Sequence, residues 1–272
     1  MEGTLEITTN ILKKGCAVGC QVCPQQLLAR TYHPQERVYL SLGDFMTALR
    51  KVPLTYRIDF SGYAEPFLNR ECSSMMLEAV GQGYAVCCYT TLVGATVEDV
   101  EVLASLPFSL PSAPLEIHLP DAGGVMPTPI TARYLEVLTA LFQKQLPFVT
   151  YMTMDPDGRV HPELQSLLKQ LDPFRPISRG GSVESVAPRE PLRGPLRCRP
   201  MPKLNHNVLL PNGDVQLCCM DYGLQHTLGN LLSGSHEELF TGAQFRALQQ
   251  AMKDGDQELL CRRCEMAEID AP

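Results

Sequence analysis

The sequence predicts an α/β protein with a parallel sheet, followed by a smaller α+β part built around a β-hairpin. Three observations support this fold class. Short apolar runs alternate with helix-like stretches over the first 180 residues, residues 180–197 are rich in Gly, Pro and Ser, and an Asn-Gly pair lies between two apolar runs beyond them. Strands that alternate with helices form right-handed βαβ units, so the sheet should be parallel, either open or closed into a barrel.

Six strands and five helices are expected in the first part. The apolar runs predict strands at 5–9, 57–61, 84–90, 115–119, 148–154 and 173–178. The helices are expected between them, at 41–52, 70–81, 96–105, 131–145 and 161–171. The first of these helices begins with a capping-box pattern at Ser41 and Asp44, and its apolar residues lie on one face.

The character of the chain changes near residue 180. The segment rich in Gly, Pro and Ser shows no periodicity, so we expect a first domain at 1–180, a linker at 181–197 and a second domain at 198–272.

The second domain should contain a hairpin and a helix. Residues 207–219 form two apolar runs around Asn212 and Gly213, a dipeptide that readily supplies the positive φ of a tight turn. A helix over 235–252 should follow, capped by Ser235 and Glu238.

Composition narrows the class of protein. The chain has 272 residues, 44% of them hydrophobic and 19% charged, as in ordinary globular proteins. A net charge of −7 argues against nucleic acid as a partner, and no apolar run is long enough to cross a membrane. The N-terminus lacks a secretory signal pattern, so we expect a cytoplasmic protein, where disulfides are uncommon. Metal ligation is therefore the leading explanation for its eleven cysteines.

The first cysteine group lies in the loop after the first strand. Cys16, Cys20 and Cys23 fall within eight positions. Three thiolates can hold three irons of a cubane [4Fe–4S] cluster and leave the fourth iron open to another ligand. The alternative is structural zinc with a remote fourth ligand such as His33.

This CxxxCxxC loop and a second motif resemble the radical S-adenosylmethionine (radical SAM) superfamily. The second motif, FSGYAEPFLN at 60–69, follows the second strand, where that superfamily carries a GGEP-type motif. The resemblance implies a partial (β/α)6 barrel, a [4Fe–4S] cluster on the three cysteines, and S-adenosylmethionine (AdoMet) bound to the open iron. Reductive cleavage of AdoMet in this superfamily gives a 5′-deoxyadenosyl radical that takes a hydrogen atom from a substrate C–H bond.

The resemblance also assigns cofactor-binding residues. The GGEP-type motif holds the methionine amino group, and its positions here are Tyr63, Ala64, Glu65 and Pro66, with Gly62 just before them.

Three further residues take family positions near the cofactor or substrate. Val22 stands where the superfamily often has an aromatic residue near adenine. Ser178 and Arg179 end the expected sixth strand, at a position near the cofactor or substrate. A surface arginine at the start of a linker is the alternative for Arg179.

The second cysteine group resembles the auxiliary-cluster domains called SPASM or twitch. Cys198, Gly213 and Cys218 follow the CX14GX4C spacing of those domains, and Cys261 and Cys264 return after the helix. The resemblance implies a second [4Fe–4S] cluster with four cysteine ligands, in the shortened, single-cluster form. A zinc ribbon is the physical alternative.

Several residues near these motifs carry less specific signals. Cys219 is the next-best ligand after Cys218, because adjacent strand residues point to opposite faces. His118 is either a satisfied core histidine or a residue near the cofactor. Asp121 and Tyr151 lie near strand ends, where barrel enzymes place catalytic groups.

The combined signals predict an enzyme. Its size and single auxiliary cluster resemble the radical dehydrogenases that oxidise an aminocyclitol alcohol, 2-deoxy-scyllo-inosamine. We therefore expect a small-molecule substrate rather than a peptide, an auxiliary cluster that accepts an electron, and an external one-electron donor such as flavodoxin or ferredoxin. Arg179 or Tyr63 could orient the alcohol.

Three alternatives remain open at this stage. One is a radical epimerase of a sugar or peptide residue, in which a thiol such as Cys219 returns a hydrogen atom. Another is a maturase that forms thioethers or crosslinks in a peptide. The third is a non-enzymatic binding module built on zinc.

Overall fold

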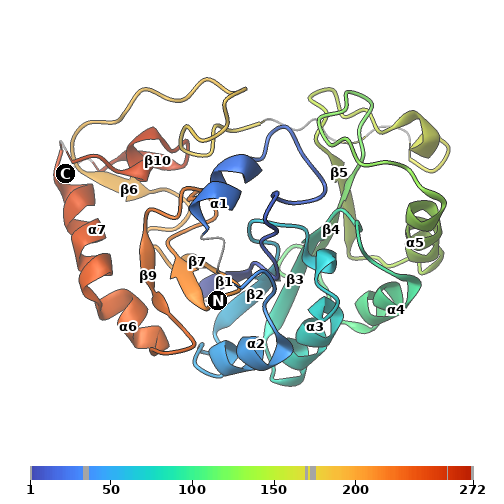
Figure 1. Ribbon diagram of the computed structural model, residues 1–272, viewed down its shortest axis with the longest axis horizontal. Coiled ribbons are helices and arrows are strands. Elements are labelled where there is room, and N and C mark those ends of the chain that lie inside the picture. The colour runs from blue at the N-terminus through green and yellow to red at the C-terminus, as the bar shows by residue number, and fades with distance from the viewer. Residues whose placement is uncertain (1, 33–36, 169–170, 172–175, 256, 271–272) are drawn as a thin grey trace.

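The computed structural model describes residues 2–32, 37–168, 171, 176–255 and 257–270. An eight-stranded sheet, in the order β5-β4-β3-β2-β1-β7-β8-β9, forms its centre. Figure 1 shows this sheet as a curve, with helices along its outer side and α1 on its inner side.

The first five strands are parallel and follow the predicted runs to within two residues at either end. Their bounds are β1 Gly3–Ile7, β2 Tyr56–Phe60, β3 Ala85–Thr90, β4 Leu115–Leu119 and β5 Val149–Thr153. Apolar residues such as Leu5, Ile7 and Ile58 are fully buried on the helix side of the sheet. Polar residues alternate with them, because successive strand side chains point to opposite faces.

The crossover helices also match the predicted ones. Their bounds are α2 Leu42–Leu49, α3 Cys72–Gly81, α4 Val97–Ser105 and α5 Ala132–Gln143. Ser41 caps α2 by accepting a hydrogen bond from Asp44 N, as predicted. A short helix that the sequence did not indicate, α1 Gln25–Thr31, follows the first cysteine loop. In the described part of the chain, none of the helices has the length and apolar character that a membrane crossing needs.

Two predicted elements at the end of the first part differ from the structure. The helix expected at 161–171 is a short 3-10 helix, η2 Pro162–Leu164, with turns up to residue 167. The sixth strand was expected at 173–178. Residues 172–175 lie outside the described residues, and 176–178 are not in a strand.

β7 His206–Leu209 lies beside β1, on the side opposite β2, and pairs with it in parallel, with Leu5 opposite Asn207. Antiparallel β8 Asp214–Gln216 and β9 Thr227–Asn230 extend the sheet beyond β7. The predicted hairpin is thus present as β7 and β8. Its turn needs Gly213, whose φ is +89° and where a Cβ would lie 2.4 Å from Leu232 Cγ. The central sheet therefore runs across the predicted domain boundaries, which stay a prediction.

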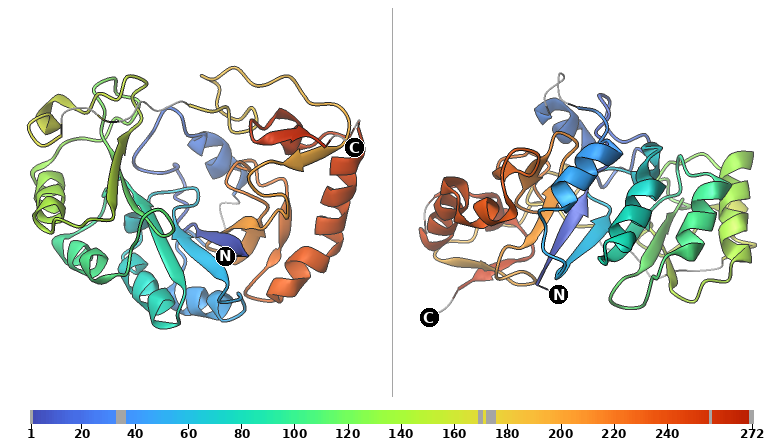
Figure 2. Two further views of the ribbon diagram at one scale, coloured as in Figure 1. Left: turned by 180° about the vertical axis from the view of Figure 1, so that it is seen from behind. Right: turned by 90° about the horizontal axis from the view of Figure 1, so that it is seen from below.

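The rest of the C-terminal part surrounds a small second sheet. β6 Leu196–Cys198 pairs antiparallel with β10 Ala267–Ile269, and a further 3-10 helix, η3 Leu260–Arg263, precedes β10. The single helix predicted at 235–252 is two helices, α6 His236–Thr241 and α7 Ala243–Lys253. They break at Gly242, whose backbone is extended, so it ends one helix and begins the next. Figure 2 shows α6 and α7 at the end of the molecule opposite α5.

Candidate active site and two cysteine groups

A cavity of about 360 Å³ lies at the carboxyl ends of the parallel strands. This volume is typical of cavities that bind small ligands, and parallel α/β folds place such cavities at this edge of the sheet. The cavity brings together the two sequence motifs that were predicted to act together. Its lining includes Cys16, Cys20, Cys23, Gly62, Glu65 and Arg179.

The three N-terminal thiols are half-buried and line this cavity from one loop. Burial raises the pKa of Cys16 to about 11 and raises that of Cys20 further, so these thiols stay protonated unless a metal stabilises the thiolates. Backbone and side-chain N–H groups point at the sulfurs: Glu65 N lies 3.5 Å from Cys16 Sγ. Sulfur ligands with N–H donors are the surroundings that iron–sulfur clusters use. The donor set therefore fits three irons of a cluster, and His33, the zinc alternative, lies outside the described residues.

Gln25 fixes the cysteine loop against the second motif. Its side chain is buried, accepts a hydrogen bond from Cys16 N at 2.9 Å, and donates to Cys23 Sγ at 3.1 Å. The same amide nitrogen lies 2.5 Å from Tyr63 O. One side chain thus sets the position of two cysteines and of the motif backbone, a role that local sequence patterns do not reveal.

Gly62 allows the second motif to pass close to β1. Its φ is +60°, and a Cβ there would lie 2.2 Å from Thr8 Oγ1 and 2.9 Å from Thr8 N. Only glycine combines that conformation with that approach. Val22 also lines the cavity, as the resemblance implied.

The Glu65 carboxylate is buried and receives four hydrogen bonds from the protein. Its donors are Phe67 N at 3.1 Å, Thr90 Oγ1 at 2.6 Å, and both Thr91 N and Thr91 Oγ1 at 2.7 Å. Burial raises the pKa of Glu65, and these bonds lower it by less. The carboxylate therefore ties the motif to the end of β3, and its direct contact with AdoMet stays a prediction.

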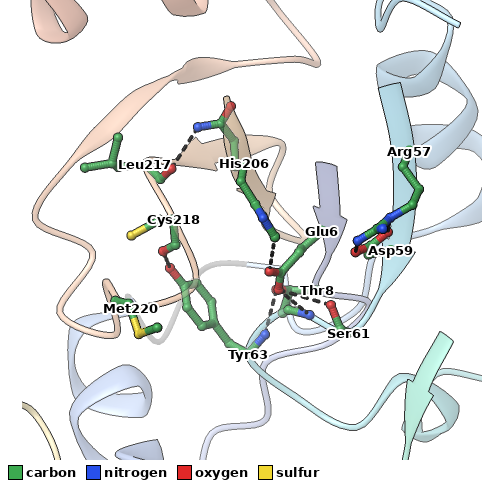
Figure 3. Close-up of polar contacts among 12 residues, drawn as sticks. Glu6, Thr8, Arg57, Asp59, Ser61, Tyr63, His206, Leu217, Cys218 and Met220 are labelled. Atoms are coloured by element: carbon green, nitrogen blue, oxygen red, sulfur yellow. Dashed lines mark hydrogen bonds and ion pairs between the residues drawn. The ribbon is translucent and has the colours of Figure 1, made fainter. Parts of the chain in front are cut away.

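Tyr63 connects the motif to the second cysteine group. Its ring is buried and packs against that of Tyr222, with centroids 4.7 Å apart and the ring planes tilted by 57°. Its hydroxyl lies 2.8 Å from Cys218 O and 3.1 Å from Asp221 O, as Figure 3 shows for Cys218. Since a tyrosine hydroxyl has one proton to donate, this hydroxyl is already occupied. A role of Tyr63 in orienting substrate stays a prediction.

Arg179 reaches the cavity from the segment before the second part. Its guanidinium lies 5.9 Å from the ring centroid of Tyr222, and its Nη1 is 3.7 Å from Met220 Sδ. Burial lowers the pKa of Arg179, and the facing Tyr222, Cys219 and Cys23 raise it by more. The residue therefore presents a positive charge between the two cysteine groups.

Ser178, which precedes Arg179, is fully buried and plays a local part. Its hydroxyl accepts a hydrogen bond from Gly181 N at 3.0 Å, and its backbone N–H donates to Glu265 Oε1. Among the described residues, Ser178 is not part of the cavity lining. Its role as a cofactor-binding residue stays a prediction.

The second cysteine group surrounds a separate small cavity of about 40 Å³, which is mainly apolar. It is lined by Cys198, Cys218, Cys219, Cys261 and Cys264 together with residues such as Met266. Burial raises the pKa of Cys261 to about 12, and the neighbouring Cys264 and Cys198 raise it too, so these three thiols lie close together. Met266 N lies 3.4 Å from Cys264 Sγ, again an N–H directed at sulfur. This donor set also fits a cluster.

Cys219 lies against a polar group and Cys218 against the other cysteines. Burial raises the pKa of both thiols. For Cys218, the neighbouring Cys219 and then Cys261 raise it further and a hydrogen bond from the Met220 backbone lowers it, whereas for Cys219 the carboxylate of Glu6 raises it and Arg179 lowers it. Both thiols line the small cavity, so the choice of Cys218 as the fourth ligand stays a prediction.

Glu6, His206 and Cys219 form a compact group whose ligand atoms lie within 4.8 Å of one another. Figure 3 shows Glu6 on β1 facing His206 on β7. Glu6 Oε1 lies 2.5 Å from His206 Nε2, and Oε2 accepts hydrogen bonds from Ser61 Oγ and Gly62 N. The Glu6 carboxylate already has hydrogen-bond partners within the protein, and the positive charge of the nearby Arg179 disfavours a bound cation. We therefore describe Glu6, His206 and Cys219 as a hydrogen-bonded cluster rather than a metal site.

Of the three residues with less specific signals, His118, Asp121 and Tyr151, only one lines the cavity. His118 lines the large cavity, whereas Asp121 is buried and accepts hydrogen bonds from Val125 N and Met126 N of its own loop. Tyr151 packs on Phe142 of α5, with ring centroids 5.2 Å apart, and therefore lies on the helix side of β5. The lining residues that the sequence did not indicate include Gln25, Glu116 and Tyr222, because none of them belongs to a recognisable functional motif.

Comparison with known proteins supports this assignment of fold and domain. Residues 198–265 match the SPASM family, an iron–sulfur cluster-binding domain. No curated protein matches the chain in sequence.

Similar solved structures include BtrN in complex with AdoMet and 2-DOIA, with 16% identity, a TM-score of 0.63, and coverage of 97% of this chain and 93% of that one. Native anSMEcpe with bound AdoMet has 10% identity and a TM-score of 0.54, covering 96% and 86% of the two chains. Streptococcus suis SuiB bound to its precursor peptide SuiA has 10% identity and a TM-score of 0.51, covering 97% and 69%.

The chain shares the fold of these structures, a partial α/β barrel followed by a smaller C-terminal part. Residues 198–265 of that part match the SPASM iron–sulfur cluster-binding domain. The identities to these structures are low, so they show the fold alone.

Proposed function

We propose that this protein is a radical SAM enzyme that binds two [4Fe–4S] clusters and AdoMet and oxidises a small-molecule alcohol. One observation carries the proposal: the three N-terminal thiols and the GYAEP motif line the same cavity at the carboxyl ends of the parallel strands. When bound, the first cluster and AdoMet supply a 5′-deoxyadenosyl radical that abstracts hydrogen from the substrate.

The residues of the cavity hold these groups and protect them. Cys16, Cys20 and Cys23 bind the cluster, and Gln25 donates to the thiolate of Cys23. The motif presents its backbone to the methionine part of AdoMet. Met152 and Met154 of the cavity wall, near the end of β5, help to exclude water from the radical.

Cys198, Cys218, Cys261 and Cys264 would hold the auxiliary cluster, and with four protein ligands it would supply electron transfer rather than a site for substrate. An oxidation needs such an electron acceptor, because a carbon radical must still lose one electron and one proton. Tyr63 links the motif backbone to that of Cys218, so the two cluster regions are joined by a direct hydrogen bond. An external one-electron donor, such as flavodoxin or ferredoxin, would supply the first cluster.

The mass of the product tests the reaction type. We expect a product two hydrogens lighter than its substrate, with one AdoMet consumed for each product, because hydrogen atom, proton and electron all leave. Mass spectrometry after turnover in light and heavy water makes the measurement. A product of unchanged mass that carries one solvent deuterium would instead show an epimerase, with Cys219 as the candidate donor. A modified peptide of the kind suggested by the SuiB complex would overturn the small-molecule substrate.

A further inference from the structure

The proposed oxidation requires a base in the cavity, and its ionisable lining can be examined group by group. Glu65 already accepts four hydrogen bonds. Arg179 has no acceptor atom. The hydroxyls of Tyr63 and Tyr222 are engaged by Cys218 O and by Cys23 Sγ. These groups are therefore not free to take a proton from substrate.

Besides Tyr89 and the three cysteines, the ionisable lining residues that remain are Glu116 and His118. Both lie on β4, two residues apart, so their side chains project from the same face, and both line the cavity. His118 Nε2 lies 2.8 Å from Glu116 Oε1, and the side chains are 21% and 27% exposed. The pair is therefore accessible from the cavity, near the end of a strand, where barrel enzymes place catalytic groups.

The hydrogen bond sets the tautomer of the imidazole. An ionised carboxylate only accepts, so Nε2 carries the proton and Nδ1 keeps its lone pair. No partner for Nδ1 is found in the part of the chain that the structure describes. A proton that reaches Nδ1 creates an imidazolium, which the adjacent Glu116 stabilises, as a carboxylate does in a catalytic triad.

The strands beside β4 bring one other titratable side chain toward the pair, among the residues described. Tyr89 of β3 is the register partner of Glu116, and burial raises its pKa, so it stays protonated and acts as a donor. On β5, the partner of His118 is Met152, which does not titrate. The neighbourhood therefore leaves His118 as the acceptor.

We propose that His118 accepts the hydroxyl proton of the small-molecule alcohol, and that Glu116 positions and polarises its imidazole. This inference rests on the proposed function. The O–H proton passes to Nδ1 of His118, the carbinol hydrogen leaves as an atom to the 5′-deoxyadenosyl radical, and the remaining electron goes to the oxidised auxiliary [4Fe–4S] cluster. The C–O bond becomes a carbonyl, so atoms and electrons balance.

The test uses the reconstituted full chain with 2-deoxy-scyllo-inosamine and myo-inositol, each deuterated at the carbinol carbons. His118→Gln should bind AdoMet as the unchanged protein does, but bind the polyol about tenfold more weakly, since one hydrogen bond is lost. Deuterium should still reach 5′-deoxyadenosine, whereas ketone formed per 5′-deoxyadenosine should fall by about 10²-fold or more. A substrate carbon radical should then accumulate, visible by electron paramagnetic resonance.

Two variants separate catalysis from structure. Added imidazole should restore ketone formation in His118→Ala, because it fills the vacated space with the same base. Glu116→Gln should keep polyol affinity and lower turnover, since the amide oxygen still accepts from Nε2–H but stabilises the imidazolium less. Tyr151→Phe, which changes a hydroxyl on the helix side of β5, is the matched control and should behave as the unchanged protein.

The outcomes distinguish this inference from the function it rests on. If the unchanged protein forms no 5′-deoxyadenosine, the radical SAM proposal itself fails. If it forms 5′-deoxyadenosine but neither polyol binds, the small-molecule alcohol of the proposed function is contradicted. If His118→Gln keeps the ketone yield per 5′-deoxyadenosine, or if imidazole rescues nothing in His118→Ala, His118 is not the proton acceptor and the oxidation proposal stands without it.

Discussion

Glu65 shows how a single buried side chain can hold a loop that lines the cavity. The residue is 5% exposed, and its carboxylate accepts hydrogen bonds from Phe67, Thr90 and Thr91. A carboxylate so placed holds the loop whose backbone faces the cavity, and it can act on AdoMet through that backbone.

Glu65→Ala should therefore lower both stability and AdoMet affinity while leaving the cluster thiols in place. Removing the carboxylate leaves several buried N–H and O–H donors without an acceptor, which lowers the free energy of unfolding by about 3 kcal/mol in total. Anaerobic denaturant titration and AdoMet titration measure the two effects. Glu65→Gln is the milder comparison, because its amide oxygen still accepts two of the four hydrogen bonds while its NH2 group faces the other two donors. If Glu65→Gln is less destabilised than Glu65→Ala yet loses AdoMet affinity by a hundredfold, the carboxylate itself binds the methionine ammonium.

At the residue scale, the sequence could not predict that the cavity is also lined by Gln25, Tyr222 and Glu116. The cysteines and the GYAEP motif could be predicted because their spacing is local and their chemistry is specific. Gln25 follows a proline in a polar stretch, and its three partners are 2 to 38 positions away. Such contacts depend on the fold, so no local pattern encodes them.

At the scale of elements, β1 and β7 are joined by more than their backbone ladder. The buried Glu6 of β1 pairs with His206 of β7. Burial raises the pKa of Glu6, but the hydrogen bonds from His206, Cys219 and Ser61 and the charge of His206 together lower it below its usual range. Burial lowers the pKa of His206, and Glu6 raises it by more.

These shifts predict a pH window for stability. Glu6 stabilises the fold above about pH 4.3, and this contribution is lost as the pH falls through its lowered pKa. His206 stabilises it fully below about pH 6.5, and this contribution is lost as the pH rises through its raised pKa. Unfolding free energy measured by denaturant between pH 4 and 9 should therefore decline on the alkaline side. His206→Gln should flatten that decline, and an unchanged profile in this variant would show that the pair contributes nothing.

The elements themselves were predictable to different degrees. Strands β1 to β5 and helices α2 to α5 have apolar periodicity over five or more residues, and the hairpin has its Asn-Gly turn. β6, β9 and β10 have three or four residues each, too few to show a period. The sequence also gave no sign that β7 would pair with β1, because parallel pairing between segments 200 residues apart leaves no local pattern.

At the scale of the whole molecule, the two cysteine groups should act as independent cluster sites. Anaerobic reconstitution should give about eight irons and eight sulfides per chain, the sum of two cubanes. Replacing Cys16, Cys20 and Cys23 together by Ala should leave about half of the iron and abolish AdoMet cleavage. Iron and sulfide assays make the measurement.

Two cysteines provide controls for this prediction. Cys72 is a buried thiol inside α3, so Cys72→Ala should keep the full iron content. Cys219→Ala should keep it too if Cys218 is the fourth auxiliary ligand. Zinc at one or two equivalents with no sulfide would contradict both cluster sites.

The pairing of β1 with β7 also has a consequence for how the chain is made. Leu5 pairs with Asn207, so one edge of β1 stays without a neighbouring strand until residues about 200 positions later have been synthesised. At ordinary rates of synthesis this interval lasts roughly 10 to 40 seconds. Until then, the nascent protein exposes the open edge of β1, which is a template for unwanted pairing with other chains. The ribosome must therefore add residues up to Asn207 and beyond before this edge of the first strand is paired, so the residues from β7 onward protect a strand that was made first.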